Sequence, residues 1–196
     1  MSGGAPAPPA VVARANLALV MTFSWLFLTP LCLFWGAVWG PTRPSSYPPA
    51  EVAPAPLAFL ACLALCFLPC ALPAAYYRAA TGQGTERVME ALGVRTFKRF
   101  ATNGDLVNRW GRRHDPRHRV VRDEASVREW ARQARGAERN HLVFLSMATL
   151  SIAYAAWIGW YGWALGLAAS NVVFNVYPIL LQRYNRLRIA RILREP

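Results

Sequence analysis

The chain has 196 residues, 55% of them hydrophobic, and a formal net charge of +12. This length accommodates one domain or one small helical bundle. The positive charge is segregated from four long apolar runs, and no nucleic-acid-binding module accompanies it, so the composition excludes a nucleic-acid-binding protein and favours an integral membrane protein.

The four apolar runs predict an all-α integral membrane protein with four transmembrane helices. They contain 23, 21, 17 and 18 residues, and about 20 are needed to cross a bilayer. In chain order the expected segments are a disordered leader (1–16), transmembrane helix 1 (17–39), an outer loop (40–56), transmembrane helix 2 (57–77), a basic cytosolic segment with interfacial helices (78–141), transmembrane helix 3 (142–158), an outer turn (159–163), transmembrane helix 4 (164–181) and a basic cytosolic tail (182–196). The first run is longer than a signal-peptide core, which favours an uncleaved span.

The second span carries two prolines and a row of cysteines. Pro69 and Pro73 each remove a backbone hydrogen bond, so we expect a kinked helix there. Cys62, Cys66 and Cys70 recur every fourth residue and share one helix face. Packing is the favoured interpretation, since free cysteine behaves as a small hydrophobe and no histidine lies in this span. The role of this face stays open.

The basic cytosolic segment divides into two expected helices and an irregular stretch. Residues 86–100 predict a basic amphipathic helix at the membrane surface, although Gly93 interrupts the pattern. Residues 101–122 are rich in Arg and His and are expected to be irregular. A second helix begins at Asp123, with Asp123 or Ser126 as its cap, and is expected to continue into the third span.

The basic residues predict the orientation. Residues 78–141 hold 15 of the 22 Lys and Arg, and the tail from residue 182 holds five more. The positive-inside rule therefore places both termini in the cytoplasm of a multi-pass cell-membrane protein. Aromatic side chains favoured at the headgroup layer gather at the predicted outer ends of the spans: Trp35, Trp39, Trp157, Trp160, Tyr161 and Trp163.

Glu138 and His141 are candidate catalytic residues. Their i, i+3 spacing puts them on one helix face, where a carboxylate can orient an imidazole for acid–base chemistry. The alternative is a structural pair at the helix entrance. No metal is predicted, because a Glu-x-x-His pair needs further ligands.

The fourth apolar run carries a polar stripe that continues into the tail. Its members, spaced 4, 3, 4 and 3, share one helix face: Asn171, Asn175, Pro178, Gln182 and Asn185. Buried amides are costly in hydrocarbon, so the stripe is expected to face other helices or a cavity. Pro178 also leaves the Phe174 carbonyl without its usual helical partner. Polar residues here serve either as structural contacts between helices or as part of a site.

The stripe ends in a basic cluster that also contains Tyr184. Arg183, Arg186 and Arg188 can bind phosphate or carboxylate through paired hydrogen bonds. The alternative is anchoring on anionic lipid, which explains the charge but not Gln182, Tyr184 and Asn185.

These motifs resemble the signature of the glycosyl-diaponeurosporenoate acyltransferase family, which completes staphyloxanthin-type carotenoids. The resemblance covers about residues 76–188. It includes Glu138-x-x-His141, Gly93-Val94-x3-Phe97-Lys98 and the C-terminal motif Asn171-x3-Asn175-x-Tyr177-Pro178-x3-Gln182-Arg183-Tyr184-Asn185-Arg186-x-Arg188. The resemblance implies a membrane enzyme that transfers a fatty acyl group to a sugar hydroxyl of a carotenoid glycoside or another glycolipid.

In the enzyme hypothesis, His141 is the base, Glu138 orients it, and Asn171 and Asn175 line the cavity for the lipid-like acceptor. Gln182 or Asn185 donates to the oxyanion, and the three arginines hold the phosphates of an acyl-CoA or acyl-carrier donor. No resident cofactor is expected. Membrane lipids, the acceptor and an acyl carrier protein are the expected partners. The alternatives are a non-catalytic membrane scaffold that binds a lipid or pigment for partner enzymes, and a small transporter, which the absence of repeats disfavours. The acceptor, the acyl length, the donor and the oligomeric state stay open.

Overall fold

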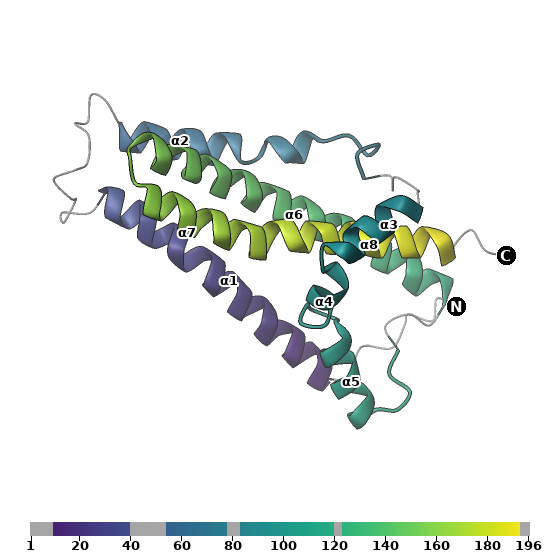
Figure 1. Ribbon diagram of the computed structural model, residues 1–196. Coiled ribbons are helices and arrows are strands. Elements are labelled where there is room, and N and C mark those ends of the chain that lie inside the picture. The colour runs from purple at the N-terminus through teal and green to yellow at the C-terminus, as the bar shows by residue number, and fades with distance from the viewer. Residues whose placement is uncertain (1–9, 40–53, 78–82, 120–122, 193–196) are drawn as a thin grey trace, which may run out of the picture. The chain divides into compact units, whose positions relative to one another are not determined.

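The computed structural model describes residues 10–39, 54–77, 83–119 and 123–192 (Figure 1). All regular elements in these ranges are helices, which confirms the all-α prediction: α1 (Ala10–Trp39), α2 (Ala55–Leu65), the 3₁₀-helix η1 (Leu68–Ala71), α3 (Gln83–Ala91), α4 (Val94–Lys98), α5 (Asp105–His114), α6 (Glu124–Trp157), α7 (Tyr161–Asn171), the π-helix η2 (Val172–Val176) and α8 (Tyr177–Ile192). Residues 1–9 of the expected leader, most of the outer loop and the last four residues of the tail lie outside the described residues. Residues 10–16, expected in the leader, form the first turns of α1.

The chain forms two compact units. The apolar unit comprises the described residues of 24–76 and 138–179, and the basic unit comprises those of 1–23, 77–137 and 180–196. Glu138 and Arg139 are the only Asp, Glu, Lys or Arg residues in the described part of the apolar unit.

Aromatic side chains form the core of the apolar unit. Phe34 is fully buried, and Trp35 stacks on Tyr154 with ring centroids 5.3 Å apart. The Trp35 indole Nε1 donates to the Ser151 Oγ at 3.1 Å. This bond satisfies the indole N–H, so Trp35 can pack in the core. The sequence pattern places Trp35 among the aromatic side chains of the headgroup layer, and the structure instead buries it. Trp39, Trp157 and Tyr161 are exposed.

The second apolar run does not form one continuous helix. The α-helix ends at Leu65, four residues before Pro69, because a proline ring clashes with the carbonyl four residues earlier and lacks an N–H to bond it. The single kinked helix expected over 57–77 is therefore wrong, because the segment breaks into α2 and η1. Cys62 and Cys66 lie in the core, whereas Cys70 lies beyond the break and is exposed.

Two described helices are long and apolar enough to cross a membrane, by length and composition: Ala10–Trp39 and Tyr161–Arg191. Residues 55–71 form a shorter apolar segment. The sequence predicted four such helices. The difference arises from the Pro69 break and from α6, which joins the third apolar run to a charged segment.

The predicted tight turn between α6 and α7 is a helix-ending motif with a left-handed glycine. Gly159 has φ +80°. Its N–H donates to the Ala156 carbonyl at 3.1 Å, and the Trp160 N–H donates to the Ala155 carbonyl at 2.8 Å. These two bonds close the α6 C-terminus as a Schellman motif and reverse the chain into α7.

The basic unit contains a helix that the sequence did not predict. Residues 105–114, expected to be irregular, form α5, which buries Val107 and Gly111. A Cβ on Gly111 would meet Val12 Cγ2 at 2.6 Å, so only glycine permits this close packing. The helix expected over 86–100 is instead split into α3 and α4 at Gly93, whose φ is +79°.

The long helix α6 begins as predicted. The Asp123 carboxylate accepts from the Ser126 N–H at 2.7 Å, and the Ser126 hydroxyl oxygen accepts from the Asp123 N–H at 3.0 Å. These reciprocal bonds satisfy backbone donors that the first turn leaves open. The helix then runs without interruption to Trp157, so Glu138 and His141 lie on the same rigid element as the third apolar run.

Candidate functional site

Polar side chains of two antiparallel helices meet inside the apolar unit. On α6, His141, Leu145 and Thr149 recur every fourth residue and share one face. Asn171 ends α7 and Asn175 lies in η2, also four residues apart. Both asparagines are buried, with 5% and 1% of their surface exposed.

The amide network runs from His141 through Asn175 and Asn171 to Thr149. His141 Nδ1 lies 3.4 Å from Asn175 Oδ1, and Asn175 Nδ2 donates to Asn171 Oδ1 at 2.8 Å. Asn171 Nδ2 in turn lies 3.3 Å from Thr149 Oγ1 and 3.4 Å from the Leu145 carbonyl oxygen. Each buried amide therefore has protein partners, as burial of polar groups requires.

A backbone irregularity places Phe174 next to the imidazole. Pro178 cannot donate to the carbonyl four residues earlier, and the segment that precedes it, Val172–Val176, is a π-helix. The ring of His141 makes a backbone hydrogen bond to Phe174. The carbonyl that proline leaves without its helical partner is thus bonded by the candidate base.

The direction of these bonds favours one tautomer of the imidazole. The Asn175 Nδ2 donates to Asn171, so its Oδ1 is the acceptor that faces His141. A neutral ring has a single N–H, and Nε2 keeps its lone pair only in the tautomer in which Nδ1–H serves both acceptors, Asn175 Oδ1 and the Phe174 carbonyl. Burial lowers the pKa of His141 below its ordinary 6.5, while the bonds to Asn175 and Phe174 act in the opposite direction. The net effect favours neutral imidazole at pH 7.

Glu138 lies one turn before His141 on α6 and is fully buried. The hydrogen bonds described for the His141 ring go to Asn175 and Phe174. Asn175 and Phe174 are therefore the described partners that hold this ring. The role of Glu138 in orienting the ring stays a prediction.

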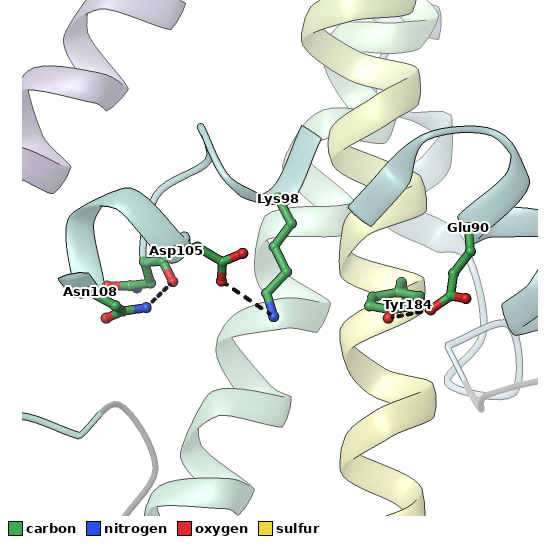
Figure 2. A network of polar contacts seen from close by, with 6 residues as sticks. Glu90, Lys98, Asp105, Asn108 and Tyr184 are labelled. Carbon is green, nitrogen blue, oxygen red and sulfur yellow. Dashed lines mark hydrogen bonds and ion pairs between the residues drawn. The ribbon is translucent and has the colours of Figure 1, made fainter. Parts of the chain in front are cut away.

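The remaining predicted residues lie on α8 in the basic unit. The Tyr184 hydroxyl donates to Glu90 Oε1 at 2.9 Å (Figure 2), so it links α8 to α3. The Arg186 guanidinium is buried and lies 5.9 Å from the Tyr77 ring centroid. The Arg188 guanidinium lies 5.9 Å from the Tyr184 ring centroid. Gln182 and Arg183 are half-buried, whereas Asn185 is buried.

Sequence reasoning missed three parts of this arrangement. It did not identify Thr149 as a partner of Asn171, the contact between His141 and Phe174, or the participation of Lys98 described below. The sequence does contain a signal for the contact with Phe174. Pro178 lacks the N–H that would bond the Phe174 carbonyl, but the sequence does not show that His141 takes its place. In the described part of the chain, no group of three or more His, Cys, Asp or Glu side chains could hold a metal ion.

Comparison with known families identifies the class of protein. The model of the glycosyl-4,4'-diaponeurosporenoate acyltransferase family matches residues 73–195, which is more than half of the chain. The protein therefore belongs to this family, as the sequence motifs suggested. Neither the curated proteins nor the solved structures gave a match.

Proposed function

We propose that the protein is a membrane acyltransferase that moves a fatty acyl group onto a hydroxyl of a lipid-like glycoside. Membership of an acyltransferase family supports the reaction class. The observation that carries the proposal is the half-buried His141, whose Nδ1 lies 3.4 Å from the Asn175 oxygen, an acceptor that favours the tautomer with a lone pair on Nε2. This is the arrangement that a general base requires.

In the proposed reaction, Nε2 of His141 removes the proton of the acceptor hydroxyl as its oxygen attacks the thioester carbonyl of the donor. The carbon–sulfur bond then breaks, and the imidazolium returns the proton to the departing thiolate. Asn175 Oδ1 accepts from Nδ1–H and so stabilises the imidazolium, as the oriented partner does in a catalytic triad. We retain Glu138 as a second stabilising group.

The polar residues take four roles in this proposal. Asn171 and Asn175 act as positioning residues, because their amides are occupied by protein partners. Gln182 is our candidate donor to the oxyanion. The buried Asn185 Oδ1 has no hydrogen-bond partner among the described residues and is suited to accept from a bound hydroxyl. Arg183, Arg186 and Arg188 would hold the phosphates of an acyl-CoA or acyl-carrier donor.

Exposed apolar surface supports the membrane assignment. Only 17% of the most apolar stretch of α1 is buried. Trp25, Leu33 and Leu57 are 69%, 59% and 66% exposed. Water-soluble monomers rarely expose contiguous apolar surface of this kind. We propose four membrane-crossing segments, a cytosolic basic unit, and His141 at the cytosolic end of the third crossing, with membrane lipids and an acyl carrier protein as candidate partners.

The decisive experiment compares His141→Gln with His114→Gln in cells and in purified membranes. His114 is exposed on α5 and bonds the Trp110 carbonyl, so it is a matched histidine outside the site. We expect His141→Gln to lower formation of the acylated glycolipid, measured by mass spectrometry, by about 100-fold or more, and His114→Gln to leave it unchanged. Normal acylation by a folded His141→Gln variant would contradict the proposal.

A second candidate function, a non-catalytic membrane scaffold, is favoured by the same exposed apolar faces. It predicts that His141→Gln is harmless, whereas polar substitutions at exposed apolar positions such as Leu33 abolish assembly with partner enzymes. Lipid analysis of the His141→Gln strain separates the two functions.

A further inference from the structure

Lys98 lies at the end of α4 in an environment that is unusual for a lysine. Its side chain is only 22% exposed, and its ammonium is 4.0 Å from Asp105 Oδ1 (Figure 2). The preceding Phe97 packs on the apolar cluster of the basic unit, which includes Val94, Leu181 and Tyr184. This packing fixes the start of the lysine side chain beside α8.

Two arginines act on the same ammonium group. Arg188 stacks over Tyr184 of that cluster, and its charge opposes the protonation of Lys98. Arg95, one turn before Lys98 on α4, does the same. Burial first, and then these like charges, lower the pKa of Lys98 below its ordinary 10.5, against the opposite effect of Asp105.

The neighbouring carboxylates do not neutralise this group. Glu86 pairs with Arg191, and Glu90, which accepts a hydrogen bond from the Tyr184 hydroxyl and keeps its charge, is not among the groups that act on Lys98. Asp105 is half-exposed and lies at the limit of ion-pair distance. Among the described residues, the charged groups that act on Lys98 are Arg95, Arg188 and Asp105, so three cations are set against one carboxylate. Lys98 is half-buried, whereas Arg95 and Arg188 are exposed, so the cluster is open to solvent on one side. Like charges gathered beside a half-buried ammonium repel one another, and an anion that joins them relieves this repulsion.

We propose that Lys98, Arg95 and Arg188 form a binding site for a phosphate ester. Two guanidinium groups offer paired donors that match phosphate oxygens, and a lysine adds a compact charge, so a phosphate dianion suits this set. The phosphate belongs to the thioester donor or to a lipid headgroup. Assignment to the donor rests on the proposed function, whereas the phosphate site itself does not.

The test uses the full chain in nanodiscs of neutral phosphatidylcholine, titrated with coenzyme A and with inorganic pyrophosphate in a calorimeter. We expect both probes to bind, and Lys98→Met and Arg188→Gln each to weaken binding about tenfold. Lys98→Arg keeps the charge and should retain most of the affinity. Arg132→Gln removes an exposed arginine that pairs with Glu129 and should leave the affinity unchanged. Circular dichroism checks that each variant is folded.

A second arm identifies the source of the phosphate. If the soluble probes fail to bind, nanodiscs that contain phosphatidylglycerol are compared with neutral ones by lipid-protection mass spectrometry. Retention of phosphatidylglycerol that Lys98→Met and Arg188→Gln abolish assigns the site to a lipid headgroup. If neither soluble probes nor anionic lipid depend on these residues, the phosphate site is overturned. If coenzyme A binding depends on them but the wild-type protein transfers no acyl group, the site stands and the acyltransferase proposal fails.

Discussion

The two units handle polar groups in opposite ways. In the apolar unit, the amide network from His141 to Thr149 consists of two amides, a hydroxyl and an imidazole that bond one another, and the buried Glu138 lies one turn before it on α6. In the basic unit, charged groups form ion pairs, stack on aromatic rings, or lie close to like charges, as Lys98 does. Burying an unpaired charge costs far more than burying a hydrogen-bonded amide, so a proton-transfer group in apolar surroundings has to be held neutral. The difference separates a region suited to proton transfer from a region suited to binding an anion.

Among the variants that test this difference between the two units, Asn175→Leu should have the largest effect on acyl transfer. It removes the Asn175 oxygen that faces Nδ1 of His141 and the Asn175 Nδ2 that donates to the Asn171 oxygen. We expect acyl transfer to fall about 100-fold and the free energy of unfolding to drop by about 1–3 kcal/mol. Activity assays and denaturant titration measure both. Ser170→Ala is the matched control, because the buried Ser170 Oγ has no partner in the described structure. Equal losses in both variants would show that the network has no special role.

The pH dependence of acyl transfer should follow neutral His141. Because burial lowers its pKa, the base form persists below pH 6.5, and we expect kcat/KM to be flat from pH 8 to about 6.5 and to fall about tenfold per pH unit only further down. The free energy of unfolding should also fall as the pH falls. The unfolded chain binds the proton first, so this contribution is complete above pH 6.5 and is lost as the pH falls through the folded pKa.

The bond to Asn175 raises the pKa, so its removal should move the remaining acid limb to still lower pH. An acid limb that begins above pH 7 would contradict a base that is neutral at pH 7.

Pro178→Ala tests the backbone contact. Alanine restores an N–H that can donate to the Phe174 carbonyl and so competes with His141. We expect higher thermal stability but about fivefold slower acyl transfer, because the imidazole loses one positioning partner. A variant that is more stable and fully active would remove Phe174 from the site.

Gly159→Ala should have the smallest effect. The φ of +80° is strained for alanine, while nothing within 4 Å would meet its Cβ, so the cost is confined to the backbone. We expect the free energy of unfolding to fall by about 1 kcal/mol with activity unchanged. The control Gly162→Ala lies inside α7 with equally open space and should be neutral or stabilising. A loss of activity in Gly159→Ala would mean that the hairpin turn affects the site.

Local patterns predicted the elements that depend on local physics. The Asp123 cap and the turn at Gly159 follow from short-range hydrogen bonds, and the residues that make those bonds are visible in the sequence. The break at Pro69 was underestimated as a kink, although its position four residues after Leu65 follows from steric rules. Helix α5 was missed because Gly104, Gly111 and Pro116 suggest irregular structure, while the packing of Gly111 on Val12 is a long-range contact.

The candidate site was predictable in composition but not in pairing. The spacing of Asn171 and Asn175 predicts a shared face, and both are buried. The spacing does not show that Asn175 and Phe174 contact His141. Contacts between two helices depend on how the helices are aligned along each other, and residue spacing within one helix does not give this alignment. Trp35 illustrates the same limit, since Ser151, which accepts its N–H, is far away in the chain.

The central claim is that His141 is a neutral base with its hydrogen on Nδ1. Nitrogen-15 NMR of the histidine-labelled protein in nanodiscs, with His141→Gln used to assign the signal, measures this directly. We predict that at pH 7 Nδ1 is protonated, Nε2 is unprotonated, and the ring titrates below pH 6.5. A signal from Nε2–H or from a doubly protonated ring at pH 7 would contradict the account.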